Sequence, residues 1–329
     1  MLTIAKNERF LTGTTFIDLF AGLGGFRLAV ESFGGKCVFS SDFDDNVADV
    51  YEANFGERPA GDITKIKEKD IPPHDILCAG FPCQPFSISG KKAGFKDTRG
   101  TLFFDIARIV KHHQPKMVLL ENVRNFARHN RGKTLATVIN TLEELGYTVH
   151  HNILNSSYYG VPQARIRVYI VALRNDLPHT QFVFPTAKLN DVSLYDILET
   201  KTRYPEGTEI NIAYALDDDH KTKIRGKPKQ PVRIGQIGLG RQGERIYHAR
   251  GHAITLAASG GGIGGKTGLY LIGNRVRRLS PRECARLNGF PDWFQLHHRR
   301  TVAYKQLGNS VVIDVVQYIL DSCQKSFGV

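Results

Sequence analysis

Short apolar runs alternate with longer amphipathic stretches through the first half of the chain, and this alternation limits the possible folds more than any other feature. We expect strands at Thr15–Phe20, Cys37–Ser41, Asp75–Ala79, Met117–Glu121 and Val168–Leu173. Helices are expected between them at Phe26–Phe33, Asn46–Asn54, Thr101–His112 and Thr134–Gly146. Repeated strand–helix units of this kind form a parallel sheet, so the expected fold class is α/β, with a doubly wound, Rossmann-like domain.

The second half of the chain has a different character. Regular alternation fades after about Pro185, and Pro228–Arg278 is rich in Gly and in basic residues, with short β-branched runs at 253–256 and 270–272. These features predict a small, mostly β lobe. A helix start at 280–283 and a helix at Val311–Ser322 indicate that the chain then returns to its first domain. The expected segments are therefore 1–190, 191–280 and 281–329.

The net charge of +12 is concentrated in one segment. Lys221–Arg278 contains thirteen Lys and Arg and a single acid, Glu244, whereas the rest of the chain contains 31 basic and 31 acidic residues. A neutral body with a basic lobe is typical of a protein that binds a polyanion. Nucleic acid is favoured over a membrane surface because the Gly-rich segment shows no amphipathic helical period. A merely solvated surface is the alternative.

The cysteines favour a reducing compartment. Their number is odd and they form no CxxC pair, which argues against a disulfide framework, and none is flanked by a His pair at zinc spacing, so no metal site is expected. The chain also has no apolar run of membrane-spanning length and no secretory signal, which predicts a cytoplasmic protein. The five are Cys37, Cys78, Cys83, Cys284 and Cys323.

A glycine-rich turn, residues 21–25, follows the first expected strand and precedes a helix. Glycines at such a turn let a ligand approach the backbone at the helix N-terminus. Position 27 is Arg, so the turn lacks the third glycine of a dinucleotide fingerprint. S-adenosylmethionine, which has adenosine but no phosphate, is therefore favoured over NAD. We expect Asp42, at the end of the second strand, to bind ribose hydroxyls, and Asp62 to accept from the adenine amino group.

Cys83 lies in the loop after the third expected strand, between Pro82 and Pro85. Loops at the carboxyl ends of parallel strands face the ligand crevice of a doubly wound sheet. This position makes Cys83 the expected nucleophile. Cys78, five residues earlier and inside the apolar strand, is expected to be inert core.

Two further strand ends supply candidate catalytic groups. Glu121 closes a strand of apolar residues, where burial would raise its pKa and suit it to act as an acid. Arg165 and Arg167 begin the last expected strand and fall on one face by the period of two. One of them could steady Glu121 or a substrate carbonyl and favour the thiolate of Cys83.

The chain resembles the bacterial cytosine-C5 DNA methyltransferases of restriction–modification systems over nearly its whole length. The shared motifs stand in the family's order: DLFAGLGG at 18–25, FPCQ at 81–84, ENV at 121–123, QARIR at 163–167, GRQGERIY at 240–247, PRECAR at 281–286 and QLGNSV at 306–311. The resemblance weakens between about Lys188 and Gln230. Asp42 stands where Glu is more usual, and Phe43 stands where a close relative has Trp.

The resemblance implies the fold, the substrate and the reaction. Residues 1–190 would form the S-adenosylmethionine-dependent catalytic domain, 191–280 a target-recognition domain, and 281–329 a hinge that returns to the catalytic domain. The target cytosine would be flipped out of duplex DNA. Cys83 would add to its carbon 6 while Glu121 protonates or hydrogen-bonds nitrogen 3, and carbon 5 would then take the methyl group.

The resemblance also implies further contacts. Ser89 and Gln242 would fill the space vacated by the flipped base, and Arg245 would read guanine. Thr255 completes the implied DNA-binding set. The cofactor contacts implied in addition to Asp42 and Asp62 are Phe20, Leu23, Gly25, Phe43, Ile63, Pro82, Leu102 and Asn309. The likeness of the lobe hints at a short GC-containing site such as GCGC, and a monomer is the default expectation.

Other readings remain open at this point. An RNA (tRNA) cytosine-C5 methyltransferase would have similar core motifs, although the long basic lobe with Gln242 favours duplex DNA. A non-enzymatic DNA-binding regulator with a methylase fold is opposed by the intact set of Cys83, Glu121, Arg165 and Asn309. An NAD-dependent oxidoreductase is the most distant alternative.

Overall fold

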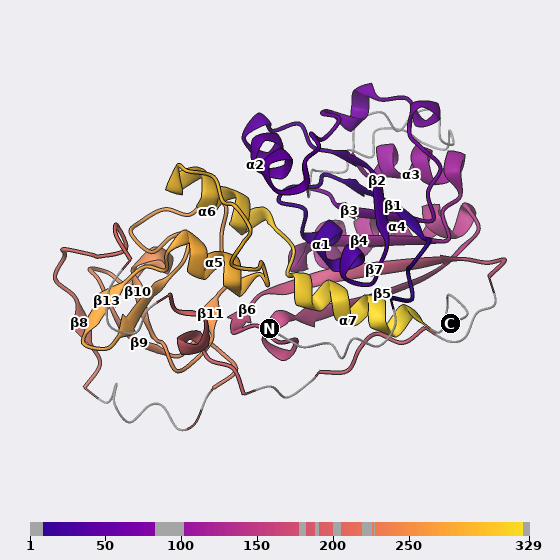
Figure 1. Cartoon of the computed structure of the whole chain (residues 1–329). Helices are drawn as coiled ribbons and strands as arrows, with labels where there is room; N and C mark the ends of the chain where they lie inside the picture. The colour runs from indigo at the N-terminus through magenta and orange to yellow at the C-terminus, as the bar shows by residue number, and fades with distance from the viewer. Residues whose placement is uncertain are drawn as a thin grey trace. The chain divides into compact units, whose positions relative to one another are not determined.

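The computed structural model describes residues 9–82, 102–177, 182–187, 191–199, 205–218, 226 and 228–324. The chain divides into two compact units, which are described separately (Figure 1). The sheet unit contains the described residues among 4–154, 166–185 and 316–329. The lobe unit contains those among 155–165 and 186–315. Residues 281–315 thus group with the lobe unit, and the roles of the three expected segments stay a prediction.

The sheet unit is built on six strands in the order β2-β1-β3-β4-β7-β5. Strands β1 to β4 are parallel to one another, as the alternation predicts. Their bounds are β1 Thr15–Leu19, β2 Lys36–Ser41, β3 Ile76–Gly80 and β4 Met117–Val123, followed by β5 Tyr147–Asn155 and β7 Ile166–Arg174. All five expected strands are confirmed to within two residues at each end.

The expectation of a wholly parallel sheet is wrong for β7, which runs antiparallel to β4. The chain reaches β7 from β5, a nine-residue strand that the sequence analysis did not predict. Ten residues separate the two strands. A connection this short permits a hairpin but not the dozen or more residues of a parallel crossover. The short connection therefore explains the reversed direction of β7.

Helices pack on this sheet through apolar faces. Ile106 and Val110 of α3 and Val138 of α4 join residues of β1, β3 and β4 in one buried cluster. Burial of such faces, rather than intrinsic propensity, supplies most of a helix's stability. The helices are α1 Gly25–Ser32, α2 Asp45–Phe55, α3 Leu102–His113, α4 Lys133–Glu144 and α7 Ile313–Cys323, with short 3-10 turns at Ile63–Lys65, Glu68–Asp70 and Arg124–Gly132. The expected helices are confirmed.

The lobe unit contains a five-stranded sheet of short strands, in the order β13-β12-β10-β9-β8, around a small core of Ile234, Ile246 and Leu269. The small, mostly β lobe is confirmed. Its strands are β8 Ala215–Leu216, β9 Arg233–Gln236, β10 Arg245–His248, β12 Leu269–Ile272 and β13 Arg275–Arg277. A separate pair joins β6 Gln163–Ala164 to β11 Ala253–Ile254. The unit also has 3-10 turns at Ser156–Tyr158, Leu194–Ile197 and Gln242–Glu244 and helices α5 Pro281–Leu287 and α6 Arg300–Asn309, of which α6 was not predicted.

Candidate active site

The carboxyl ends of four strands align at one edge of the sheet. Leu19, the last residue of β1, pairs in register with Ser41 of β2 and with Ala79 of β3. Gly80 of β3 pairs with Glu121 of β4. Parallel strands that end in register bring the residues that follow them together. This edge therefore gathers the glycine-rich turn, Asp42, the Phe81–Pro82 segment and Glu121.

The glycine-rich turn has an unusual backbone. Phe20, at its start, has φ of 55°, in the left-handed region that a bulky side chain rarely adopts. Such conformations persist where the surroundings determine them, and they gather at ligand sites. Gly24 has φ of 74°, and a Cβ added there would lie 2.5 Å from the ring of Phe55 on α2. The turn thus needs glycine both for its backbone angle and for its close approach to α2.

Asp42 is held by two main-chain donors. Its Oδ2 accepts from the Gly22 amide at 2.9 Å and its Oδ1 from the Asp44 amide at 3.0 Å. Burial raises the pKa of this carboxyl, and both hydrogen bonds act in the opposite direction. Each carboxylate oxygen has a second lone pair that can accept a hydrogen bond from a hydroxyl group. Phe43, the next residue, is 76% exposed and offers an aromatic face beside it. The carboxylate of Asp42 suits the hydroxyl groups of a ribose, and the ring of Phe43 suits a planar base.

Asp62 caps a local turn. Its Oδ1 accepts from the amide of Thr64 at 3.0 Å and from its hydroxyl at 2.8 Å, and these bonds hold the pKa of Asp62 below its usual range. Lys65 lies 3.6 Å from Oδ2. An ionised, half-buried carboxylate of this kind can also accept from an amino group. Its hydrogen bonds with Thr64 show that it has a structural role as well.

The other expected cofactor residues differ in accessibility. Leu23, Gly25 and Ile63 are buried, Phe20 and Leu102 are half-buried, and Pro82 is exposed. Asn309 is exposed at the last position of α6. It belongs to the lobe unit, whereas all the others belong to the sheet unit.

Asp18 is a candidate that the sequence analysis missed. It lies inside β1 and is fully buried, and its carboxyl interacts with the backbone and the charge of Arg27 on α1. Burial raises its pKa well above the usual value, although both interactions with Arg27 oppose this. Burying a carboxyl is costly, so its presence in the strand before the glycine-rich turn makes Asp18 a candidate for positioning that turn. The available signal was an acid within an apolar strand, two residues before the strained Phe20.

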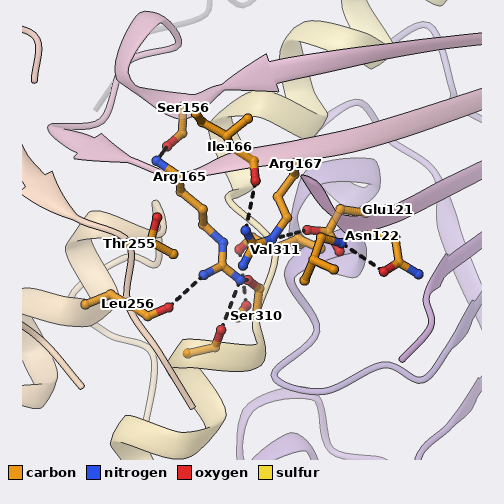
Figure 2. A network of polar contacts seen from close by, with 12 residues as sticks. Glu121, Asn122, Ser156, Arg165, Ile166, Arg167, Thr255, Leu256, Ser310 and Val311 are labelled. Carbon is orange, nitrogen blue, oxygen red and sulfur yellow. Dashed lines mark hydrogen bonds and ion pairs between the residues drawn. The ribbon is translucent and has the colours of Figure 1, made fainter. Parts of the chain in front are cut away.

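Glu121 and Arg167 form a half-buried ion pair at the site edge (Figure 2). The Nε atom of Arg167 lies 3.0 Å from Oε1 of Glu121, and the two side chains are 13% and 10% exposed. The pair places a cation directly beside this carboxylate. Arg167 is thus the arginine that steadies Glu121, which decides between the two candidates of the QARIR motif.

Arg165 and Arg167 have different partners. Arg165 belongs to the lobe unit and donates to carbonyls there, whereas Arg167 belongs to the sheet unit. The expected alternation does not continue through them, because β6 ends at Ala164 and β7 begins at Ile166. The single-strand alternation that predicted one face for both arginines is therefore interrupted at Arg165.

Asn122 links β4 to the segment that leads to the expected nucleophile. Its side-chain Nδ2 is buried and donates to the carbonyl of Phe81 at 2.9 Å. Cys83 itself lies outside the described residues. The described chain reaches Pro82, one residue before it, next to the strand that carries Glu121. Asn122 is a second residue whose positioning role the sequence analysis missed.

Two expected DNA-reading residues share one exposed turn. Gln242 and Arg245 are both exposed, at the start of a 3-10 turn and of β10. The amide of Gly264 donates to the carbonyl of Gly243 at 2.8 Å, which ties this turn to the glycine-rich segment at 260–265. The hydroxyl of Thr255 instead donates to the carbonyl of Ala164 at 2.6 Å, so it is engaged within the protein. Ser89 lies outside the described residues.

One basic residue that the sequence assigns to the basic lobe does not lie on its surface. Arg277 is 1% exposed and pairs with Glu283, so it does not contribute to the basic surface. Within residues 228–278, the exposed basic side chains are Arg233, Arg241, Arg245, Arg250 and Arg275. Of the thirteen basic residues counted from the sequence, Arg277 is therefore internal and paired.

The chain is similar to known proteins over nearly its whole length. A family model described as C-5 cytosine-specific DNA methylase matches residues 14–325. The Type II methyltransferase M.HhaI of Haemophilus parahaemolyticus is 53% identical over 318 residues, which cover 96% of each chain. The Type II methyltransferase M.HpaII of Haemophilus parainfluenzae is 43% identical and is matched over 92% of this chain and 87% of its own.

Solved structures share the fold at lower identity. The Dnmt2 methyltransferase of S. pombe superposes with a TM-score of 0.70 at 21% identity, over 94% of this chain and 98% of that chain. A putative DNA modification methyltransferase encoded within a prophage of E. coli gives a TM-score of 0.69 at 22% identity, over 96% and 100%. These likenesses concern the fold alone, and they agree with the expected α/β class.

Proposed function

We propose, on the premise that the chain belongs to the C-5 cytosine-specific DNA methylase family, that Cys83, Glu121 and Arg167 carry out its chemistry. Membership defines the reaction, which transfers a methyl group from S-adenosylmethionine to carbon 5 of cytosine in DNA. The observation that carries the assignment is the Glu121–Arg167 pair beside the strand that leads to Cys83. The family and the named relatives concern DNA, so the RNA alternative loses its support.

The proposed steps use the residues at this edge. The thiolate of Cys83 adds to carbon 6 of a flipped-out cytosine, while Glu121 donates a hydrogen bond or proton to ring nitrogen 3. Arg167 holds the carboxyl of Glu121 in place. The added electron density makes carbon 5 a nucleophile, and the sulfonium of the bound cofactor supplies the methyl group. Loss of the carbon 5 proton and cleavage of the bond between Cys83 and carbon 6 restore the aromatic ring and the thiolate.

For the cofactor we propose that Asp42 binds the ribose, Phe43 stacks on the adenine and Asp62 accepts from its amino group. Asp18, buried and interacting with Arg27, lies on the strand that leads into the same turn. No metal is required by this mechanism, because the thiolate and the sulfonium provide the nucleophile and the leaving group.

Asp42→Ala is expected to weaken S-adenosylmethionine binding by about 1–3 kcal/mol, the usual cost of losing hydrogen bonds to a charged group. DNA binding without cofactor should change little. Calorimetric titration measures both affinities. Asp45→Ala is the matched control, because Asp45 is an exposed acid nearby that pairs with Arg58 on the surface, at 3.4 Å. Equal cofactor affinity in both variants and the wild type would move the ribose contact elsewhere.

The cellular role proposed here is protection of host DNA from a cognate restriction endonuclease, because the similar proteins are named Type II methyltransferases. The proposal includes action as a cytoplasmic monomer on a short GC-containing site, with GCGC as the first candidate. Among the described residues, no helix has the length and apolarity needed to cross a membrane. Bisulfite sequencing of DNA from cells that express the chain tests the role, and an unmodified genome would contradict it.

DNA binding is expected to depend strongly on salt, with the basic lobe as the main source. Log K should fall with log salt by about 0.9 per neutralised phosphate, so a footprint with half of the lobe's basic groups gives a slope on the order of −5. Arg250→Ala should reduce the slope by about one unit for all sequences alike. Arg245→Ala should instead reduce discrimination by about 1–3 kcal/mol at one base pair.

Salt titrations of wild type and both variants on cognate and scrambled duplexes provide the measurement. Slopes and preferences that match wild type in both variants would show that this surface does not read DNA.

A further inference from the structure

The guanidinium of Arg165 is buried among main-chain carbonyls. It is 3% exposed, and its Nη1 donates to the carbonyl of Leu256 at 3.1 Å. Its Nη2 donates to the carbonyls of Gly308 and Ser310 at 3.0 and 2.7 Å (Figure 2). Hydrogen bonds from a charged donor in a buried setting are among the strong ones. One side chain thus joins two segments that are far apart in the sequence.

Gln163, two residues earlier and fully buried, reinforces the same junction. Its Oε1 accepts from the amide of Leu256 at 3.1 Å, and its Nε2 donates to the carbonyl of Leu287 and to Oδ1 of Asn288, both at 2.9 Å. The side chain of Asn288 then donates to the carbonyl of Leu307 at 2.8 Å. All these residues belong to the lobe unit. The QARIR motif therefore begins with a structural network rather than with a substrate contact.

The two joined segments lie in direct backbone contact. A Cβ added to Gly308 would lie 2.2 Å from the amide nitrogen of Ala258, so only glycine permits this approach. Asn309 lies between the two residues whose carbonyls Arg165 binds. On the other side, Leu256 and Ala258 lead into the glycine-rich segment at 260–265, which is hydrogen-bonded to the turn that carries Gln242. The junction thus connects Asn309, which the family resemblance implies as a cofactor contact, with the turn that carries Gln242 and Arg245.

We propose that Arg165 is a positioning residue that sets the backbone on which Asn309 and the DNA-reading segments depend, and that it does not act on the cytosine. This proposal rests on the proposed function and refines its site. Arg167, two residues on, touches the proposed catalytic carboxylate, whereas the Arg165 guanidinium donates to three main-chain carbonyls. Loss of Arg165 should therefore affect binding of cofactor and choice of DNA, and loss of Arg167 should affect the chemical step.

The test compares Arg165→Lys with Arg167→Lys in the full chain. Lysine keeps the charge but cannot bridge three carbonyls with the fixed geometry of a guanidinium. For Arg165→Lys, S-adenosylmethionine affinity and the preference for cognate over scrambled duplex should each fall about tenfold. Its single-turnover rate at saturating cofactor and DNA should stay within about threefold of wild type. Arg167→Lys should show the reverse, with near-normal affinities and a single-turnover rate lower by about a hundredfold.

A second measurement tests whether Arg165→Lys loosens the junction locally or destabilises the whole fold. Amide hydrogen exchange in Arg165→Lys should become faster at 256–258 and at 307–311 together, and slow exchange should persist in the central sheet. Loss of single-turnover rate with unchanged affinity, preference and exchange would overturn the positioning role and make Arg165 catalytic. If Arg167→Lys kept its full rate, the proposed catalytic site would fail instead, whatever the outcome for Arg165.

Discussion

Cys83→Ser is expected to lower methyl transfer to duplex DNA by at least about a thousandfold, because a serine hydroxyl is scarcely ionised where a cysteine is a competent thiolate. The four described cysteines are all buried. Burial raises the pKa of Cys37 to about 12 and those of Cys78, Cys284 and Cys323 above their usual value. None of these four is suited to attack a substrate, which supports the proposal that Cys83 is the nucleophile.

The measurement pairs turnover with covalent trapping. A duplex with 5-fluorocytosine at the target should form a complex with the wild type that survives denaturation, because fluorine does not leave as the proton does. Cys83→Ser should not form it, while its cofactor and DNA affinities remain near normal. Cys78→Ala, a change at a buried cysteine on the strand before Cys83, is the matched control and should still trap. Substantial turnover by Cys83→Ser would rule out the covalent mechanism.

The second large effect is expected in the free energy of unfolding, at a buried ion pair. Glu283→Gln should lower the free energy of unfolding by about 3–5 kcal/mol, because it leaves the buried guanidinium of Arg277 without its counter-charge. The two side chains are 1% and 0% exposed and pair through two contacts of 2.7 and 2.8 Å. Glu283 also accepts from the amide of Ser280 at 2.9 Å and from that of Glu199 at 3.2 Å. One carboxylate therefore joins β13, the start of α5 and the distant segment that contains Glu199.

Urea denaturation followed by circular dichroism gives the free energies. Asp292→Asn removes the charge of an exposed pair with Arg286 and should change stability by less than about 1 kcal/mol. The double variant Arg277→Met, Glu283→Leu should recover part of the loss, because a buried pair can be exchanged for apolar groups at small cost. A Glu283→Gln protein as stable as the Asp292→Asn control would show that the pair contributes little.

The sequence alone predicted the elements that local patterns encode. The strands β1 to β4 and the helices α1 to α4 follow from the alternation of apolar runs and amphipathic stretches. The turn before α1 was predicted from its glycines, whose need for positive φ is a property of the residue itself. Family motifs then identified the reaction, because they hold the chemical groups at recognisable spacings. None of these inferences requires knowledge of which distant segments meet.

The tertiary structure decided the points that depend on such meetings. β7 runs antiparallel because the short connection from β5 reverses the chain, and the unpredicted β5 leaves no strong period in the sequence. Arg165 and Arg167 are alike in the sequence, but one binds carbonyls more than ninety residues away and the other binds Glu121. Asp18 and Arg277 are buried only because other segments enclose them. Periodicity and turn chemistry act between neighbours along the chain, whereas the partner of a charged side chain is chosen by packing between remote segments.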